Sequence, residues 1–126
     1  LFEGVGKAVE LKKESDFDAL TAVSGSGPAY VFVAIEALAD GAVARGLDRE
    51  TAIELAVETV AGSALLADER DAHTAQLKDE VASPGGTTIT GLARLEELGF
   101  RGDLIEAVRA AADKSRELTD ELLGDQ

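Results

Sequence analysis

Residues 29–46, AYVFVAIEALADGAVARG, decide the fold. Between Ala29 and Ala39 the only charged residue is Glu36. A run of this composition favours a helix, and a helix that is apolar almost all round must be buried on nearly every side. A chain of 126 residues offers few other elements to cover it. We therefore predict a buried helix whose cover comes in part from a second copy of the chain.

Turn signals bound this helix on both sides. The segment 24-SGSGP-28 predicts a break, with Pro28 well placed as the first helical residue. Gly46 ends the helix, and Asp48 caps the next one. The apolar stripe of that second helix consists of Ile53, Val57, Val60, Ala64 and Leu65. Its solvated face carries the acids Glu50, Glu54 and Glu58, which are more typical of such a face than of a metal site.

The remaining segments also predict helices. The polar connector 68-DERDAHTAQ-76 leads into a short helix at about 77–81, and 82-ASPGGTTITGL-92 opens another helix that Gly99 closes. Asp103 caps the last helix, whose apolar face recurs at spacings of four and three, as in a bundle. That face consists of Leu104, Val108, Ala111, Ser115, Leu118 and Leu122. The predicted fold class is all-α.

The first fifteen residues, LFEGVGKAVELKKES, differ from the rest. Val9 and Leu11 alternate with polar neighbours as in a short strand, yet no second strand follows to pair with it. We therefore expect 1–15 to be the end of a neighbouring domain. Residues 16–126 then form a helical domain that opens on a short turn capped by Asp16.

Composition argues against several functions. There is no cysteine, so the chain has neither a disulfide nor a thiolate metal site. Twenty-five acidic residues against twelve Lys and Arg give a net charge of −13, which opposes nucleic-acid binding because that requires clustered cations. We find no apolar run of the roughly 18 residues that a membrane span needs and no signal peptide, so we expect a soluble, cytoplasmic protein. The dispersed acids are typical of a halophile, in which salt screens their repulsion.

The loop at 82–88 is the strongest candidate for a binding site. Pro84 stops the preceding helix, and the two glycines after it leave room for a ligand. Thr87 or Thr88 then caps the next helix, whose first N–H groups lack helical partners and favour an anion. The loop either holds a carboxylate or phosphate, or only separates two helices.

Other polar motifs are weaker candidates. Gly4-Val5-Gly6 lacks a preceding strand and the third glycine of a dinucleotide motif, and 24-SGSGP-28 lacks the lysine of a P-loop. His73, the only histidine, lies in a polar connector without metal-ligand spacing, so we predict a solvated residue and no metal site.

Two long motifs follow one another in order: SGSGPAYVFVAIEALADGAVARGL and then QLKDEVASPGGTTITGLARLEELGFRGDLIEAV. From about Asp18 to Leu118 the chain resembles the C-terminal half of the pyrroline-5-carboxylate reductase family. SPGGTT, with Gly91 and Leu95-Glu96 at their usual offsets, is the most specific signature. The family reduces pyrroline-5-carboxylate to proline with NADH or NADPH, in the last step of proline synthesis.

The resemblance implies a two-domain architecture. In the family an N-terminal Rossmann domain precedes a helical domain, two helical domains interlace into a dimer, and dimers commonly assemble into a decamer. Residues 1–15 match the last helix and strand of the Rossmann domain, the rest of which is missing from this sequence. Helix 28–46 matches the one that crosses into the partner. We therefore expect this chain alone to be inactive.

The resemblance also implies roles for individual residues. The substrate carboxylate is held, near the dimer interface, by Ser83, Gly85, Gly86, Thr87 and Thr88. The hydroxyl of Thr88 also reaches the ring nitrogen, which makes Thr88 the catalytic candidate. The residues expected near the nicotinamide are Lys78, Asp79, Glu80 and Val81. Asp71 stands where the family has a glutamate, which leaves any role of that side chain open.

Two alternatives remain. The chain is a helical dimerisation module without catalytic function, or it is the helical domain of a related dehydrogenase that acts on a different acid. Titration with proline against hydroxy acids would separate these possibilities.

Overall fold

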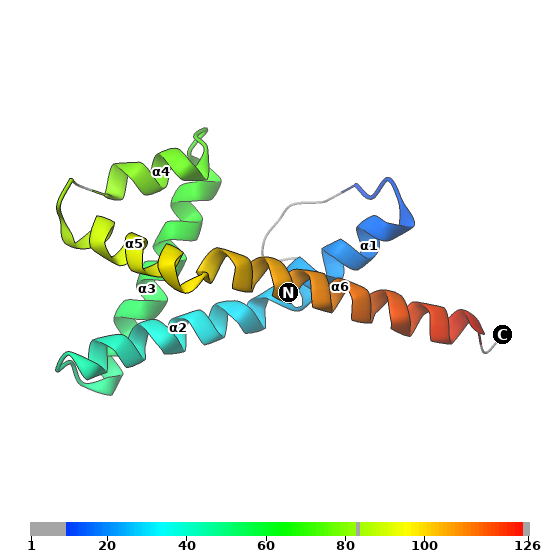
Figure 1. Cartoon of the computed structure of the whole chain (residues 1–126), viewed down its shortest axis with the longest axis horizontal. Helices are drawn as coiled ribbons and strands as arrows, with labels where there is room; N and C mark the ends of the chain where they lie inside the picture. Colours follow the sequence, from blue (N-terminus) through cyan, green and yellow to red (C-terminus); the bar gives the residue numbers. More distant parts are fainter. Residues whose placement is uncertain (1–9, 83, 125–126) are drawn as a thin grey trace. The chain divides into compact units, whose positions relative to one another are not determined.

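The computed structural model describes residues 10–82 and 84–124, which form helices and no strand (Figure 1). The elements are α1 (Glu14–Leu20), the π-helical turn η1 (Thr21–Gly25), α2 (Gly27–Ala44), α3 (Arg49–Glu69), α4 (Thr74–Val81), α5 (Thr87–Leu98) and α6 (Phe100–Gly124). The all-α prediction is confirmed. Of the strand expected near the start, Val9 lies outside the described residues, and Leu11 belongs to no regular element. The domain boundary at residue 16 stays a prediction.

The described residues form two compact units. The first contains α1, η1, the start of α2 through Tyr30, and α6 from Arg101 onward. The second spans Val31–Phe100 and contains the rest of α2, with α3, α4 and α5. Each unit brings together segments that are distant in sequence or joined by short turns.

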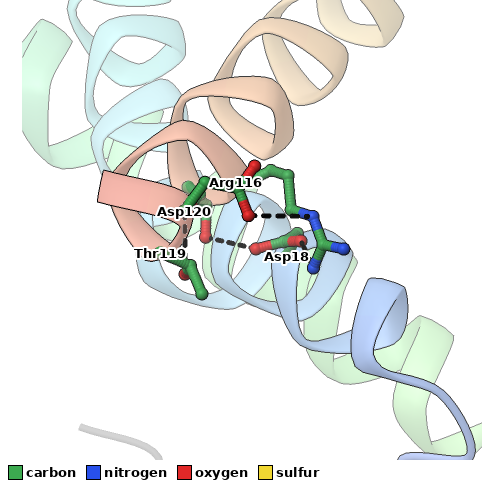
Figure 2. A network of polar contacts seen from close by, with 5 residues as sticks. Asp18, Arg116, Thr119 and Asp120 are labelled. Carbon is green, nitrogen blue, oxygen red and sulfur yellow. Dashed lines mark hydrogen bonds and ion pairs between the residues drawn. The ribbon is translucent and has the colours of Figure 1, made fainter. Parts of the chain in front are cut away.

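A buried carboxylate joins the helices of the first unit. Asp18 of α1 is 7% exposed and accepts a 2.7 Å hydrogen bond from the hydroxyl of Ser115 on α6. A guanidinium nitrogen of Arg116 lies 3.8 Å from the second oxygen of Asp18, and Arg116 also reaches Asp120 at 3.8 Å (Figure 2). Ser115 was predicted as a member of an apolar face. It is instead the polar partner of Asp18.

The start of α1 differs from the prediction. The N-cap is Lys13, and Asp16 lies inside the first turn. Its carboxylate nevertheless accepts hydrogen bonds of 3.1 Å from the backbone N–H groups of Lys12 and Lys13. Asp16 therefore reaches back from within the helix and satisfies the N–H of the cap residue and that of the residue before it.

The predicted break at 24-SGSGP-28 is wrong, because the chain stays helical there. The N–H of Ser26 donates to the carbonyl of Thr21 at 3.0 Å, the five-residue spacing of a π turn. Small residues in this segment tolerate the widened turn. Pro28 lies in the first turn of α2, directly after this widened turn.

An alanine-rich contact between α2 and α3 forms the core of the second unit. Its buried residues are Ala39, Ala52 and Ala56, and the partly buried residues around them are Ile35, Ala42, Val43 and Ile53. Of the stripe predicted for α3, Ile53 lies at this contact, but Val57 and Leu65 are exposed. The prediction failed because a close helix contact selects small residues, and helical periodicity alone does not show which stripe makes the contact.

The ends of α2 and α5 follow the predictions. Gly46 has φ 110°, and Asp48 caps α3 by accepting a 3.0 Å bond from the N–H of Thr51. Gly99 has φ 85° and ends α5. The start of α6 was predicted wrongly, because this helix begins at Phe100 and Asp103 lies within its first turn.

The helix predicted to be buried is largely uncovered within one protomer. Phe32 and Val33 of α2 are 62% and 63% exposed, and Leu38 is 51% exposed. Bare aliphatic and aromatic side chains on this scale indicate a partner surface. Cover by a second copy remains the expectation.

One membrane-related prediction needs correction. Among the described residues, the helical stretch Glu14–Ala44 is apolar and long enough, by composition, to cross a membrane. This stretch was not predicted as continuous because a break was expected near Pro28. A helix buried between protein subunits has the same composition, so this finding alone does not indicate a membrane.

Candidate functional site

The loop between α4 and α5 is described on both sides of Ser83. Helix α4 ends at Val81, and Ala82 is its extended C-cap. Gly85 has φ 69°, a left-handed conformation that favours glycine. Gly86 is extended, with φ −86° and ψ −178°, and is the N-cap of α5. Two glycines therefore turn the chain into α5 without a side chain standing at the helix entrance.

The first turn of α5 presents donors that the helix does not use. The first helical backbone bond runs from the N–H of Thr90 to the carbonyl of Gly86, at 3.4 Å, and the hydroxyl of Thr90 reaches the same carbonyl at 3.1 Å. Helical geometry gives the N–H groups of Thr87 and Thr88 no acceptor within α5. A carboxylate at this N-terminus would meet directed N–H groups and a favourable dipole.

The structure corrects the predicted cap. Gly86, and not Thr87 or Thr88, is the N-cap, and as a glycine it supplies no side-chain cap. Thr87 is exposed and Thr88 is half-buried. Ser83, the remaining hydroxyl predicted for this site, lies outside the described residues. The threonine hydroxyls are therefore not committed to capping α5, which leaves them available for a ligand.

The residues predicted to lie near a nicotinamide occupy the last turn of α4. Lys78 and Asp79 are exposed, with 4.0 Å between the ammonium nitrogen and a carboxylate oxygen. Val81 is 65% exposed, which leaves an apolar side chain directly before the loop. Glu80 instead points to the end of α3, where it pairs with Arg70.

The Arg70–Glu80 pair was not found by sequence analysis. Two guanidinium nitrogens of Arg70 donate to the two carboxylate oxygens of Glu80, at 2.9 and 3.1 Å. These hydrogen bonds lower the pKa of Glu80 and raise the pKa of Arg70. The two residues belong to different helices, so no single helical period relates them and no sequence pattern could have revealed the pair.

The connector before α4 has a structural role that the sequence did not show. His73 is the N-cap of α4, and its Nδ1 accepts a 3.0 Å bond from the N–H of Ala75. The side chain is exposed, as expected for a solvated histidine. Asp71, at the position where a glutamate was expected, is also exposed.

Comparison with known proteins gives a consistent result. A family model described as pyrroline-5-carboxylate reductase dimerisation matches residues 14–118. The pyrroline-5-carboxylate reductases of Glycine max and of Synechocystis are 56% and 58% identical over 94% of this chain. The chain spans only 43% and 44% of these relatives.

Solved structures show the same similarity. The Plasmodium falciparum pyrroline carboxylate reductase, solved with NADP bound, is 44% identical with a TM-score of 0.80, over 84% of this chain and 40% of that one. The Coxiella burnetii pyrroline-5-carboxylate reductase is 41% identical with a TM-score of 0.83, over 86% of this chain and 40% of that one.

Fold and site together define a class: a helical oligomerisation domain that carries a candidate anion-binding loop at a helix N-terminus. The bare apolar face of α2 and the glycine loop before α5 are the two features that set this class. The chain belongs to the pyrroline-5-carboxylate reductase dimerisation family.

Proposed function

We propose that this chain is the dimerisation and substrate-binding part of a reductase that converts 1-pyrroline-5-carboxylate into L-proline with NADH or NADPH. The family match over residues 14–118 supports the reaction class. The observation that carries the proposal is the loop that ends in the Gly86 N-cap, because its free donors suit the carboxylate that this substrate carries.

In this proposal the loop selects and orients the substrate. The net charge of −13 repels an anionic substrate at long range, so attraction must come from short, directed donors. The N–H groups of Thr87 and Thr88 supply such donors, and the family resemblance assigns the hydroxyl of Ser83 to the same site. Gly85 and Gly86 let the carboxylate approach the backbone closely.

Thr88 has a second role in the proposal. Reduction of the C=N bond places a hydride on carbon and requires a proton on the ring nitrogen. The hydroxyl of Thr88, which does not cap the helix, hydrogen-bonds to that nitrogen and orients the ring. Positioning of this kind is one of the larger contributions that a binding site makes to catalysis.

The cofactor supplies the hydride when it is bound. The last turn of α4 fits its uncharged nicotinamide end, because Val81 offers exposed apolar surface and Arg70 neutralises Glu80. The chain spans only 43% and 44% of its relatives. The rest of the cofactor is therefore assigned to a nucleotide-binding domain outside this chain.

The proposed assembly is a homodimer in the cytoplasm, with a decamer as its higher form. The support is the family's dimerisation domain and the uncovered apolar face of α2. In a dimer, that face lies against the partner, and the substrate loop lies near the interface between the two copies.

The test is a titration followed by NMR at the amides of Gly86 to Ile89. L-Proline, the proposed product, should shift these amides saturably, whereas hydroxy acids of equal carboxylate charge should shift them much less. Equal responses to all acids would favour a related dehydrogenase or a general anion site. No response at these amides would leave the dimerisation module as the better description.

A further inference from the structure

The Arg70–Glu80 pair joins the end of one helix to the end of another. Arg70 is the C-cap of α3, and Glu80 is the penultimate residue of α4. Both oxygens of Glu80 are engaged, at 2.9 and 3.1 Å, so the pair is bidentate and fixes the orientation of both groups. A single flexible contact would not impose this geometry.

The pair lies close to the start of the glycine loop. Glu80 is two residues before Ala82, the C-cap from which the loop to α5 departs. At the other end of α4, His73 caps the helix through its Nδ1. The short helix α4 is therefore capped at its start and joined to α3 at its end, and the contact with α3 lies next to the loop.

Ion pairs within a single helix do not have this arrangement. Arg94 and Glu97 pair at 3.0 Å within a single turn of α5, where the helix already holds both residues. Their contact cannot fix one segment relative to another. Arg94–Glu97 is more exposed to solvent than Arg70–Glu80 but joins the same two residue types, so it serves as the within-helix control.

We propose that Arg70 is a positioning residue for the substrate loop, acting through Glu80 to hold the last turn of α4 and the departure point of the loop. This inference rests on the proposed function, in which the loop binds a carboxylate. Arg70 does not touch the substrate. Its effect is to reduce the number of conformations that the loop must lose on binding.

A set of glutamine variants tests this role in the complete chain. Arg70→Gln, Glu80→Gln and the double variant should each weaken L-proline binding at the loop amides by about two- to fivefold, the range expected when one exposed contact is lost. The double variant should be no worse than either single variant, because one contact is removed in all three. Arg70→Lys should recover part of the affinity. The control Arg94→Gln should bind as the unsubstituted chain does.

A charge effect alone gives a different pattern. If Arg70 served only to mask an acid, Glu80→Gln would bind L-proline equally well or more tightly, and that outcome overturns the proposal. Amide hydrogen exchange supplies a readout that needs no ligand: exchange at Lys78 to Ala82 should rise in Arg70→Gln and not in Arg94→Gln. Unchanged exchange also overturns the proposal. If exchange at Lys78 to Ala82 rises in Arg70→Gln but L-proline shifts no loop amide, the proposed function is wrong. The Arg70–Glu80 pair would then still be shown to hold the last turn of α4.

Discussion

The hydroxyl of Ser115 donates a 2.7 Å hydrogen bond to the nearly buried carboxylate of Asp18, joining α6 to α1 across 97 residues of sequence. Hydrogen bonds to charged groups contribute about 1.5–3 kcal/mol. We therefore expect Ser115→Ala to lower the free energy of unfolding by about that amount, measured by urea denaturation. Ser63→Ala, at an exposed position on α3, is the control for helix propensity. Equal stability of the two variants would mean that the Asp18 contact contributes nothing.

Acidification should weaken the start of α3. The hydrogen bond from the N–H of Thr51 lowers the pKa of Asp48 in the folded chain. The stabilisation is therefore present above the unfolded pKa, which is about 3.9, and is lost as the pH falls through the lower folded value. Between about pH 7 and pH 3 the Tm of Asp48→Asn should fall less than that of the unsubstituted chain, because asparagine caps without titrating. The Tm of Ser63→Ala, a change on the same helix that involves no titratable side chain, should fall as far as that of the unsubstituted chain.

The bare face of α2 predicts an obligate dimer. Interlaced helices should bury more than the roughly 1,600 Å² of a standard interface. Phe32→Glu places a charge on that face and should yield monomeric or unfolded chain by light scattering at micromolar concentration. If Phe32 faces water in the assembled protein, as it does in one protomer, the substitution will change neither mass nor Tm.

Salt should stabilise the protein. A chain with a net charge of −13 repels itself, and added ions screen that repulsion. We expect the Tm to rise as KCl goes from dilute to molar. A flat or falling Tm would count against a halophilic origin.

Variants of the glycine loop distinguish a role in substrate binding from a role in only separating two helices. Since Gly86 and not Thr88 caps α5, Thr88→Val should change stability by less than the roughly 1 kcal/mol of a lost cap. In the complete reductase, loss of a hydrogen bond to a charged or reacting group should lower kcat/KM about ten- to a hundredfold. Thr59→Val, the same change on α3, is the control.

Gly86→Val should impair the reductase more than Thr88→Val. The backbone of Gly86 is extended and allowed for any residue, so backbone strain is not the cause. The valine side chain would stand where the carboxylate approaches the N–H groups. Steady-state kinetics with pyrroline-5-carboxylate varied at saturating NAD(P)H measure this effect, with cofactor affinity expected to stay unchanged. Full activity in both variants would mean that the loop only separates α4 from α5.

Local signals were enough to predict several helix ends. Gly46, Asp48 and Gly99 act through their own backbone or side chain within one turn, so each could be identified from its neighbours alone. The cap at α5 was placed one or two residues too late, because a glycine without a side-chain contact competes with threonine for that position. Which residue becomes the N-cap depends on where the preceding loop ends and helical backbone angles begin.

Contacts between distant segments could not be predicted in the same way. Asp18–Ser115 and Arg70–Glu80 depend on how helices pack, and nothing in their spacing marks them. The apolar face of α3 was predicted from periodicity, which does not show which stripe meets α2. The site residues at 78–81 and 83–88 came from family resemblance, and their ligand-binding roles remain predictions.

The alanine contact between α2 and α3 limits how this sequence can evolve. At a leucine or isoleucine core position, substitution can proceed to several smaller or equal side chains. At Ala39, Ala52 and Ala56 only glycine is smaller, and every other residue overfills the contact. Almost no substitution at these three positions is therefore expected to be neutral. Variation between related chains should accumulate on the outer faces of α2 and α3, wherever no partner covers them.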